Sequence, residues 1–171
     1  TWKIQGNNIL SNNQPITLLW DNGEGIVFSK KIDLDDKYLF KITQKVQNNT
    51  PKKIELYPYA QITRNKVPDD IQNFYISHEG FIGVFDEELK EDDYDDIEEK
   101  KIVREANEGW LGITDKYWMT AVVPKKGENF KSTFLYKDAF KANYILNKPS
   151  IIEPSTSETN EVKLFVAAKE V

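Results

Sequence analysis

The chain lacks cysteine altogether and contains a single histidine, His78. Without cysteine there is no disulfide framework, no thiol nucleophile and no cysteine-based zinc site. A two-histidine metal site or a Ser-His-Asp triad would need partners for His78 that the sequence does not identify. The sequence therefore predicts no catalytic residue, no metal site and no cofactor.

Long hydrophobic runs and an excess of positive charge are missing as well. The mean hydropathy is −0.60, and no apolar stretch is long enough to cross a membrane. The 23 Lys and Arg residues are outnumbered by 28 Asp and Glu residues, so no basic field would attract nucleic acid. No signal peptide follows Thr1, and because the chain begins and ends abruptly we interpret it as a piece of a longer protein.

The chain is rich in the residues that build a core. It has 171 residues, of which 12% are aromatic and 30% are charged, with a net charge of −5. Disordered chains are poor in aromatic side chains, so most of this sequence is expected to fold. Its length predicts one domain over residues 1–171, or two very small ones.

The hydrophobic pattern has a period of two. Apolar residues alternate with polar ones over Ile26–Leu34, Tyr38–Gln47 and Ile54–Arg64, and turn-forming residues separate these stretches. They are predicted to be three strands of an antiparallel meander. Further strands are predicted at Phe74–Ser77, Phe81–Phe85, Trp110–Thr114, Tyr117–Val123, Phe130–Tyr136, Ala142–Leu146 and Val162–Ala167.

This number of short strands indicates an all-β protein of antiparallel strands, either a sandwich or a barrel. Only the acidic stretch Glu87–Ala106 could be helical, so helical segments are expected to be short. Pro149–Thr159, with Pro154 among serines and threonines, is interpreted as a surface loop.

The acidic stretch contains a run of carboxylates that includes Asp92, Asp93, Asp95 and Asp96. A calcium loop needs a glycine and a fixed ligand spacing, and this run has neither. Charge blocks of this kind are solvated or form interaction surfaces. We therefore predict that these four aspartates belong to a partner-binding surface.

Trp110, Trp118 and His78 are the candidates for a cleft. Exposed aromatic side chains on a sandwich can stack on sugars or accept apolar peptide segments, although core packing is the alternative for each tryptophan. Alternation puts Trp118 and Thr120 on one face and Tyr117 and Met119 on the other. His78 is more simply explained as a structural residue near a turn than as an acid–base partner of Glu79.

Several strings carry a resemblance to a known family. In order, they are WDNGEG from Trp20, LDDKYLF from Leu34, LYPYA from Leu56, HEGFIGV from His78 and GWLGITDKYW from Gly109. Together they closely resemble the large periplasmic domain of the YidC family of bacterial membrane protein insertases, from Thr1 to Val171. Five matches in one order make the resemblance specific.

The resemblance implies a β-supersandwich similar to that of galactose mutarotases, located in the periplasm of a bacterial inner-membrane protein, between its first and second membrane spans. It implies a non-enzymatic accessory role in the insertion and folding of inner-membrane proteins. The implied partners are the translocon components SecDF and SecYEG and nascent membrane proteins, and the region matching the family's partner contact is Ser77–Ile97. Membrane attachment would come from segments outside this chain.

The mutarotase-like fold also raises an alternative, a carbohydrate-binding or aldose-epimerase-like domain. Fold does not determine function, so this alternative depends on the site. Mutarotases use a glutamate with several histidines, and a chain with His78 alone cannot supply that set.

Overall fold

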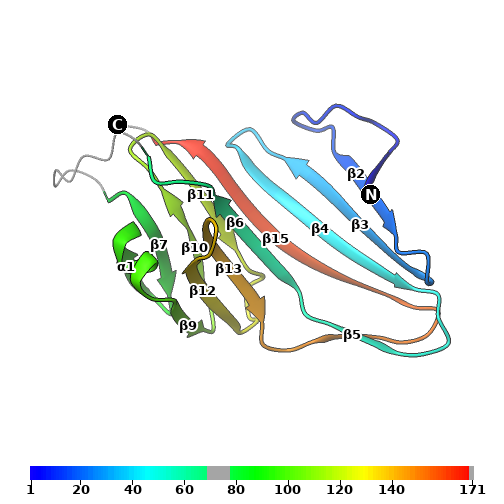
Figure 1. Ribbon diagram of the computed structural model, residues 1–171. Coiled ribbons are helices and arrows are strands. Elements are labelled where there is room, and N and C mark those ends of the chain that lie inside the picture. The colour runs from blue at the N-terminus through cyan, green and yellow to red at the C-terminus, as the bar shows by residue number, and fades with distance from the viewer. Residues whose placement is uncertain (69–77, 170–171) are drawn as a thin grey trace. The chain divides into compact units, whose positions relative to one another are not determined.

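The computed structural model describes residues 1–68 and 78–169, and most of their elements are labelled in Figure 1. Contacts between residues divide the chain into two compact units. Unit 1 comprises Thr1–Pro58 and Lys148–Leu164, and unit 2 comprises Tyr59–Asn147 and Phe165–Val171. Strand β15 (Ser157–Ala168) contributes residues to both units.

Unit 1 is built on an antiparallel sheet. β1 (Lys3–Gln5), β2 (Ile16–Asp21), β3 (Ile26–Leu34) and β4 (Leu39–Asn48) follow one another in the sheet, and β15 borders β4. β5 (Ile54–Leu56) pairs with β14 (Ser150–Ile152) in a separate two-stranded ribbon. The alternating residues of β3 and β4 therefore lie on opposite faces of one sheet, as their pattern predicted.

Asn48, at the end of β4, fixes the ribbon to the sheet. Its side chain is 0% exposed, and its amide nitrogen donates to the carbonyl oxygens of Lys52 and Ile152 at 2.8 and 2.9 Å. Its amide oxygen accepts from the backbone N–H and the hydroxyl of Thr50 at 2.9 and 2.7 Å. The buried amide thus provides hydrogen-bond partners for backbone groups of two loops, at the point where the inter-strand hydrogen bonds of the sheet end.

Unit 2 is a sandwich of two antiparallel sheets. In the larger sheet the order is β8 (Glu88–Asp92), β7 (Gly80–Phe85), β10 (Gly109–Thr114) and β11 (Trp118–Val123), and the end of β15 borders β11. In the smaller sheet the order is β6 (Tyr59–Arg64), β13 (Phe140–Leu146), β12 (Phe130–Tyr136) and β9 (Ile102–Ala106).

Aromatic side chains fill the space between the two sheets of unit 2. Phe81 of β7 is 0% exposed, and its ring centroid lies 5.0 Å from that of Phe134 on β12. Phe85 packs against Phe130 at 6.4 Å, and Phe130 against Tyr144 at 5.9 Å. Burial of these large rings is the main source of stability of the unit.

Replacing Tyr144 by phenylalanine is expected to raise the free energy of unfolding by about 1 kcal/mol. The Tyr144 side chain is 0% exposed, and its hydroxyl has no hydrogen-bond partner among the described residues. Burial, together with the negative charge of Glu128, raises the pKa of Tyr144, so the uncharged hydroxyl is the form to consider. Chemical denaturation of both proteins measures the change in the free energy of unfolding. A decrease of similar size in the variant would contradict the prediction.

The all-β antiparallel fold predicted from the sequence is confirmed. Of the predicted strands, Ile26–Leu34 and Phe130–Tyr136 are found with these bounds, and Phe81–Phe85 and Trp110–Thr114 each begin one residue earlier, at Gly80 and Gly109. The stretch Ile54–Arg64 is divided at Tyr57 and Pro58 into β5 and β6, neither of which pairs with β4, so the predicted meander is wrong there. Proline removes a backbone donor, which explains the break. The predicted strand Phe74–Ser77 lies outside the described residues.

Two other segments differ from their predictions. The helix considered for Glu87–Ala106 is reduced to α1 (Tyr94–Glu99), because β8 and β9 take up the residues on either side. Pairing of β8 with β7 and of β9 with β12 overrides the helical tendency of the acidic stretch. The predicted loop Pro149–Thr159 contains β14 and the start of β15. No helix in the described residues is long and apolar enough to span a membrane.

Candidate functional site

A pocket of about 350 Å³ lies in unit 2 beside β6. Ile62 and Arg64 line it from β6, Trp118 and Thr120 from β11, and Val166 from β15. Trp118 is 59% exposed, so its indole forms an accessible aromatic wall. An exposed indole with aliphatic neighbours is a surface on which an apolar group can be desolvated.

The polar rim of the pocket is a network around Asp115. Arg64 forms an ion pair and hydrogen bond with the Asp115 carboxylate, and the Tyr94 hydroxyl donates to the same carboxylate at 3.1 Å. Burial raises the pKa of Tyr94, and the negative charge of Asp115 adds to this effect. Because Arg64 and Asp115 neutralise each other, the rim offers hydrogen bonds without a net charge.

Trp110 and Trp118 point to opposite faces of the larger sheet. Thr120 pairs with Ile113, so the side chains of these two residues lie on the same face of the sheet. Trp118 lies two residues before Thr120 and shares this face. Trp110 lies three residues before Ile113 and therefore points to the opposite face. Trp118 faces the pocket together with Ile113 and Thr120. The two tryptophans therefore do not form one cleft, and only Trp118 belongs to this candidate site.

His78 is held by neighbouring residues rather than aimed at the pocket. It is half-buried, and its Nε2 lies 2.8 Å from the carbonyl oxygen of Phe81. Its Nδ1 is 3.7 Å from a carboxylate oxygen of Asp93. Gly80 has a φ of +154° and leaves no space for a Cβ, which would lie 3.1 Å from the His78 ring. These contacts favour the structural interpretation of His78.

Of the four aspartates predicted to bind a partner, Asp92 is not on the surface. It is 8% exposed, and its two carboxylate oxygens accept hydrogen bonds from Arg104 at 2.7 and 2.8 Å. The Arg104 guanidinium also lies over the rings of Phe85 and Phe134, at 5.5 and 5.6 Å from their centroids. Both charges are paired within unit 2, so Asp92 is less accessible to a partner than the other three aspartates.

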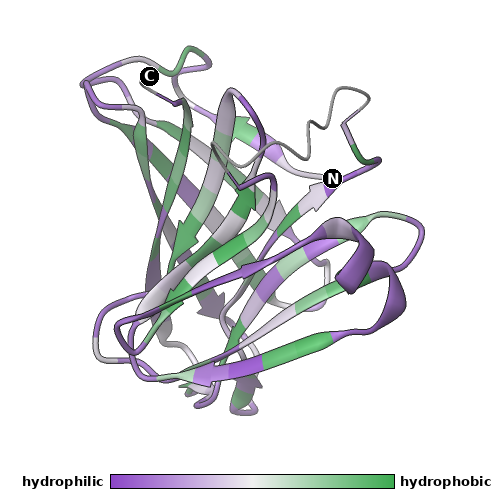
Figure 2. Cartoon of the chain, turned by 90° about the vertical axis from the view of Figure 1, so that its left-hand side faces the viewer, coloured by the Kyte–Doolittle hydropathy of each residue, from purple (hydrophilic) through white to green (hydrophobic). Residues whose placement is uncertain are grey.

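The other three aspartates lie at the exposed side of α1. Tyr94 and Ile97 are buried and anchor this helix, whereas Asp93, Asp95 and Asp96 are exposed. No basic residue lies in its last turn, and its hydrophilic character is visible as purple on the coiled ribbon in Figure 2. We call Asp93, Asp95 and Asp96 the acidic helix surface.

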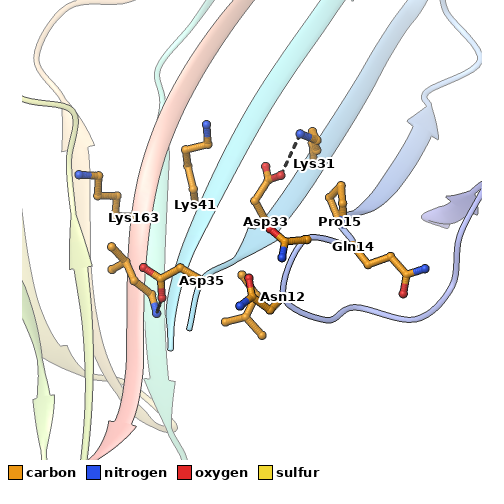
Figure 3. Close-up of a pocket in the computed structure, with 11 residues that line it drawn as sticks. Asn12, Gln14, Pro15, Lys31, Asp33, Asp35, Lys41 and Lys163 are labelled. Carbon is orange, nitrogen blue, oxygen red and sulfur yellow. Dashed lines mark hydrogen bonds and ion pairs between the residues drawn. The ribbon is translucent and has the colours of Figure 1, made fainter. Parts of the chain in front are cut away.

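A second pocket, of about 560 Å³, lies in unit 1 (Figure 3). Lys41 of β4, Lys163 of β15 and Lys31 of β3 surround it, and Lys31 pairs with Asp33 at 2.8 Å. No aromatic side chain is among its lining residues. Its ammonium and carboxylate groups suit polar ligands. It therefore differs from the pocket beside β6, which we call the Trp118 pocket. The described residues include no cluster of three or more His, Cys, Asp or Glu side chains that could hold a metal ion.

A family model described as the YidC periplasmic domain matches the chain over residues 1–171. The chain belongs to this family. It is 47% identical over 170 residues to the membrane protein insertase YidC of Pelagibacter ubique, a match that covers 99% of this chain and 30% of that protein. It is 37% identical over 183 residues to the YidC of Cereibacter sphaeroides, covering 99% of this chain and 29% of that protein. The chain thus spans less than a third of these relatives.

Family membership places the chain in the periplasm, as a domain of an inner-membrane insertase, which confirms the resemblance and the predicted location.

Similar solved structures confirm the galactose mutarotase-like fold. A galactose mutarotase related enzyme from Lactobacillus acidophilus matches with a TM-score of 0.64 and 11% identity, over 99% of this chain and 73% of that one. The α-galactosidase AgaA from Geobacillus stearothermophilus matches with a TM-score of 0.62 and 9% identity, over 99% of this chain and 27% of that one. At such low identity the likeness concerns the fold alone.

Sequence reasoning found Trp118 but missed the other walls of its pocket. Ile62, Arg64 and Val166 come from strands far apart in the chain, and each fits an ordinary strand pattern. No local signal distinguishes them, since the pocket results from the way the two sheets of unit 2 pack.

Proposed function

We propose that this chain is a non-catalytic accessory domain of a membrane protein insertase, which helps inner-membrane proteins to insert and fold by binding other proteins in the periplasm. The observation that supports this most is the family match over residues 1–171. The proposed partners are the translocon components SecDF and SecYEG and segments of nascent membrane proteins. The relatives that support this role are named membrane protein insertases.

The acidic helix surface is the proposed contact for a translocon partner. Its three carboxylates are exposed on a helix whose Tyr94 and Ile97 side chains are buried, so the charges are presented from a fixed support. Such a surface fits a basic patch on the partner. Exposed interfacial charges change the association rate and its salt dependence more than they change the dissociation rate.

Reversing the charge of Asp93, Asp95 and Asp96 to lysine is expected to slow association with purified SecDF by about tenfold at low salt. The difference should shrink at high salt, because ions screen exposed charges. Surface plasmon resonance at the two salt concentrations measures both effects.

The matched control reverses three other exposed glutamates, namely Glu24, Glu105 and Glu158. This control changes the net charge equally and should leave the association rate nearly unchanged. Circular dichroism and thermal unfolding verify that both variants fold. Equal association rates for the two triple variants would remove the acidic helix surface from the proposal.

The likeness to sugar-processing enzymes does not lead to a second proposal. It rests on 9–11% identity, and His78, the single histidine of the chain, is engaged with Phe81 and Asp93. The Trp118 pocket is instead the proposed contact for a segment of nascent membrane protein, since aliphatic side chains line much of it.

A further inference from the structure

Among the described strands of unit 2, the larger sheet extends one strand further than the smaller sheet. β6 lies against β11, and β13 lies against β10. The larger sheet continues beyond β11 to the end of β15, whereas β6 is the last strand of the smaller sheet among the described residues. The end of β15 therefore has no described strand of the smaller sheet packed over it.

We call the place where the larger sheet extends past β6 the step. The Trp118 pocket lies at this step. It is bounded by Ile62 and Arg64 on β6 and by Val166, at the end of β15, on the larger sheet. A strand added beside β6 would lie over Val166 and against Trp118. The pocket is thus located where a fifth strand of the smaller sheet would run.

The free edge of β6 determines the kind of ligand that fits. Ala60, Ile62 and Arg64 alternate with Tyr59, Gln61 and Thr63, and the second set is exposed. β13 pairs with one edge of β6, from Tyr59 to Arg64, and no described strand pairs with the other. An unpaired edge presents backbone N–H and C=O groups that another extended chain can satisfy.

The side chains around the step determine which extended chain fits best. Ile62, Ile113, Val166 and Trp118 provide apolar walls, and the charges of Arg64 and Asp115 cancel at the rim. A pocket of about 350 Å³ is at the small end of ligand sites and suits a few side chains. Apolar side chains at alternate positions of a strand would point into it together.

We propose that β6 and the Trp118 pocket bind an extended polypeptide segment by strand addition, with alternate apolar side chains inserted between Ile62, Val166 and Trp118. This inference rests on the proposed function and specifies how a nascent membrane protein is bound before it becomes helical. Main-chain hydrogen bonds to β6 supply affinity for any sequence, and the pocket selects apolar side chains. Such a site suits clients that differ in sequence.

The test uses the 171-residue chain and a short capped peptide of alternating valine and threonine that carries a fluorophore. Fluorescence anisotropy measures binding. A second peptide of the same sequence carries N-methyl groups on the amides of one strand edge, which removes hydrogen-bond donors and keeps the side chains. We expect the first peptide to bind and the methylated peptide to bind at least about tenfold more weakly. Equal affinity of the two peptides would overturn strand addition.

Variants of neighbouring residues locate the site. Replacing Trp118 by alanine should weaken binding by about tenfold, since aromatic residues dominate such contacts. Tyr117 is 55% exposed and precedes Trp118 but does not line the pocket, so replacing it by alanine should leave the affinity nearly unchanged. Amide hydrogen exchange should show new protection in β6 when peptide is bound. Equal effects of the two variants, or protection confined to other strands, would contradict the proposal.

Other occupants of the step give different results. A second copy of the chain at the step would give dimers, which the Trp118 variant abolishes and which the peptide cannot dissociate. A sugar at the step would give saturation-transfer NMR signals, which the peptide removes. Either result would overturn the proposal. If the peptide fails to bind while charge reversal on α1 slows SecDF association, strand addition is wrong and the proposed function stands. Peptide binding without an effect of charge reversal would support strand addition and would remove only the acidic helix surface from the proposed function.

Discussion

Replacing Arg104 by methionine is expected to lower the free energy of unfolding by about 3–5 kcal/mol. Methionine keeps the length and apolar contacts of the side chain but leaves the Asp92 carboxylate, which is 8% exposed, without its bidentate partner. Asp92 is on β8 of the larger sheet and Arg104 on β9 of the smaller one, so the pair also joins the two sheets of unit 2. Urea denaturation followed by tryptophan fluorescence measures the loss.

An exposed ion pair provides the control for this prediction. Lys125 lies 3.3 Å from Glu128, and its side chain is 54% exposed. Replacing Lys125 by methionine should change the stability by less than about 1 kcal/mol, because solvent screens the pair. The double variant with Asp92 as leucine and Arg104 as methionine should recover part of the loss, since it removes the unpaired charge. Similar losses for Arg104 and Lys125 would contradict the prediction.

Replacing Asn48 by alanine is expected to lower the free energy of unfolding by about 2–4 kcal/mol. The change removes the donor to the buried carbonyl oxygen of Ile152 and the acceptor for the backbone N–H of Thr50. It also leaves a cavity at a position that is 0% exposed. Thermal and urea unfolding measure the stability, and faster amide exchange in β14 would show that the ribbon is released.

The neighbouring residue provides a matched control. Asn49 is exposed, and no side-chain hydrogen bond of its own is found among the described residues. Replacing it by alanine should leave the stability within about 0.5 kcal/mol of the original, as for most surface substitutions. If the two asparagines behave alike, Asn48 does not fix the ribbon.

The strands were predictable because their signal is local. Over Ile26–Leu34 the alternation of apolar and polar residues follows from the geometry of a strand, whichever partner the strand finds. The acidic stretch shows the limit of local signals, since β8 and β9 replaced most of the expected helix. Their pairing partners, β7 and β12, lie on either side of it in the chain, and only the folded sheets bring them into register.

The candidate site was only partly predictable for a similar reason. Trp118 stands out by residue type, but whether it shares a face with Trp110 depends on the register of β10 and β11. The carboxylate of Asp92 looks equivalent to those of Asp93 and Asp95 in the sequence. Only the structure shows that Arg104 buries one of these carboxylates and leaves the other two exposed.

The sequence by itself determined the fold class, the family and the lack of cysteine and histidine chemistry, because composition, strand periodicity and ordered motifs are properties of the chain alone. The tertiary structure decided which aspartates are exposed, that the Trp118 side chain is accessible, and at which strand the described part of the smaller sheet of unit 2 stops. These features depend on contacts between residues that are far apart in the chain. The step that forms the Trp118 pocket exists only because two sheets with different numbers of strands pack together.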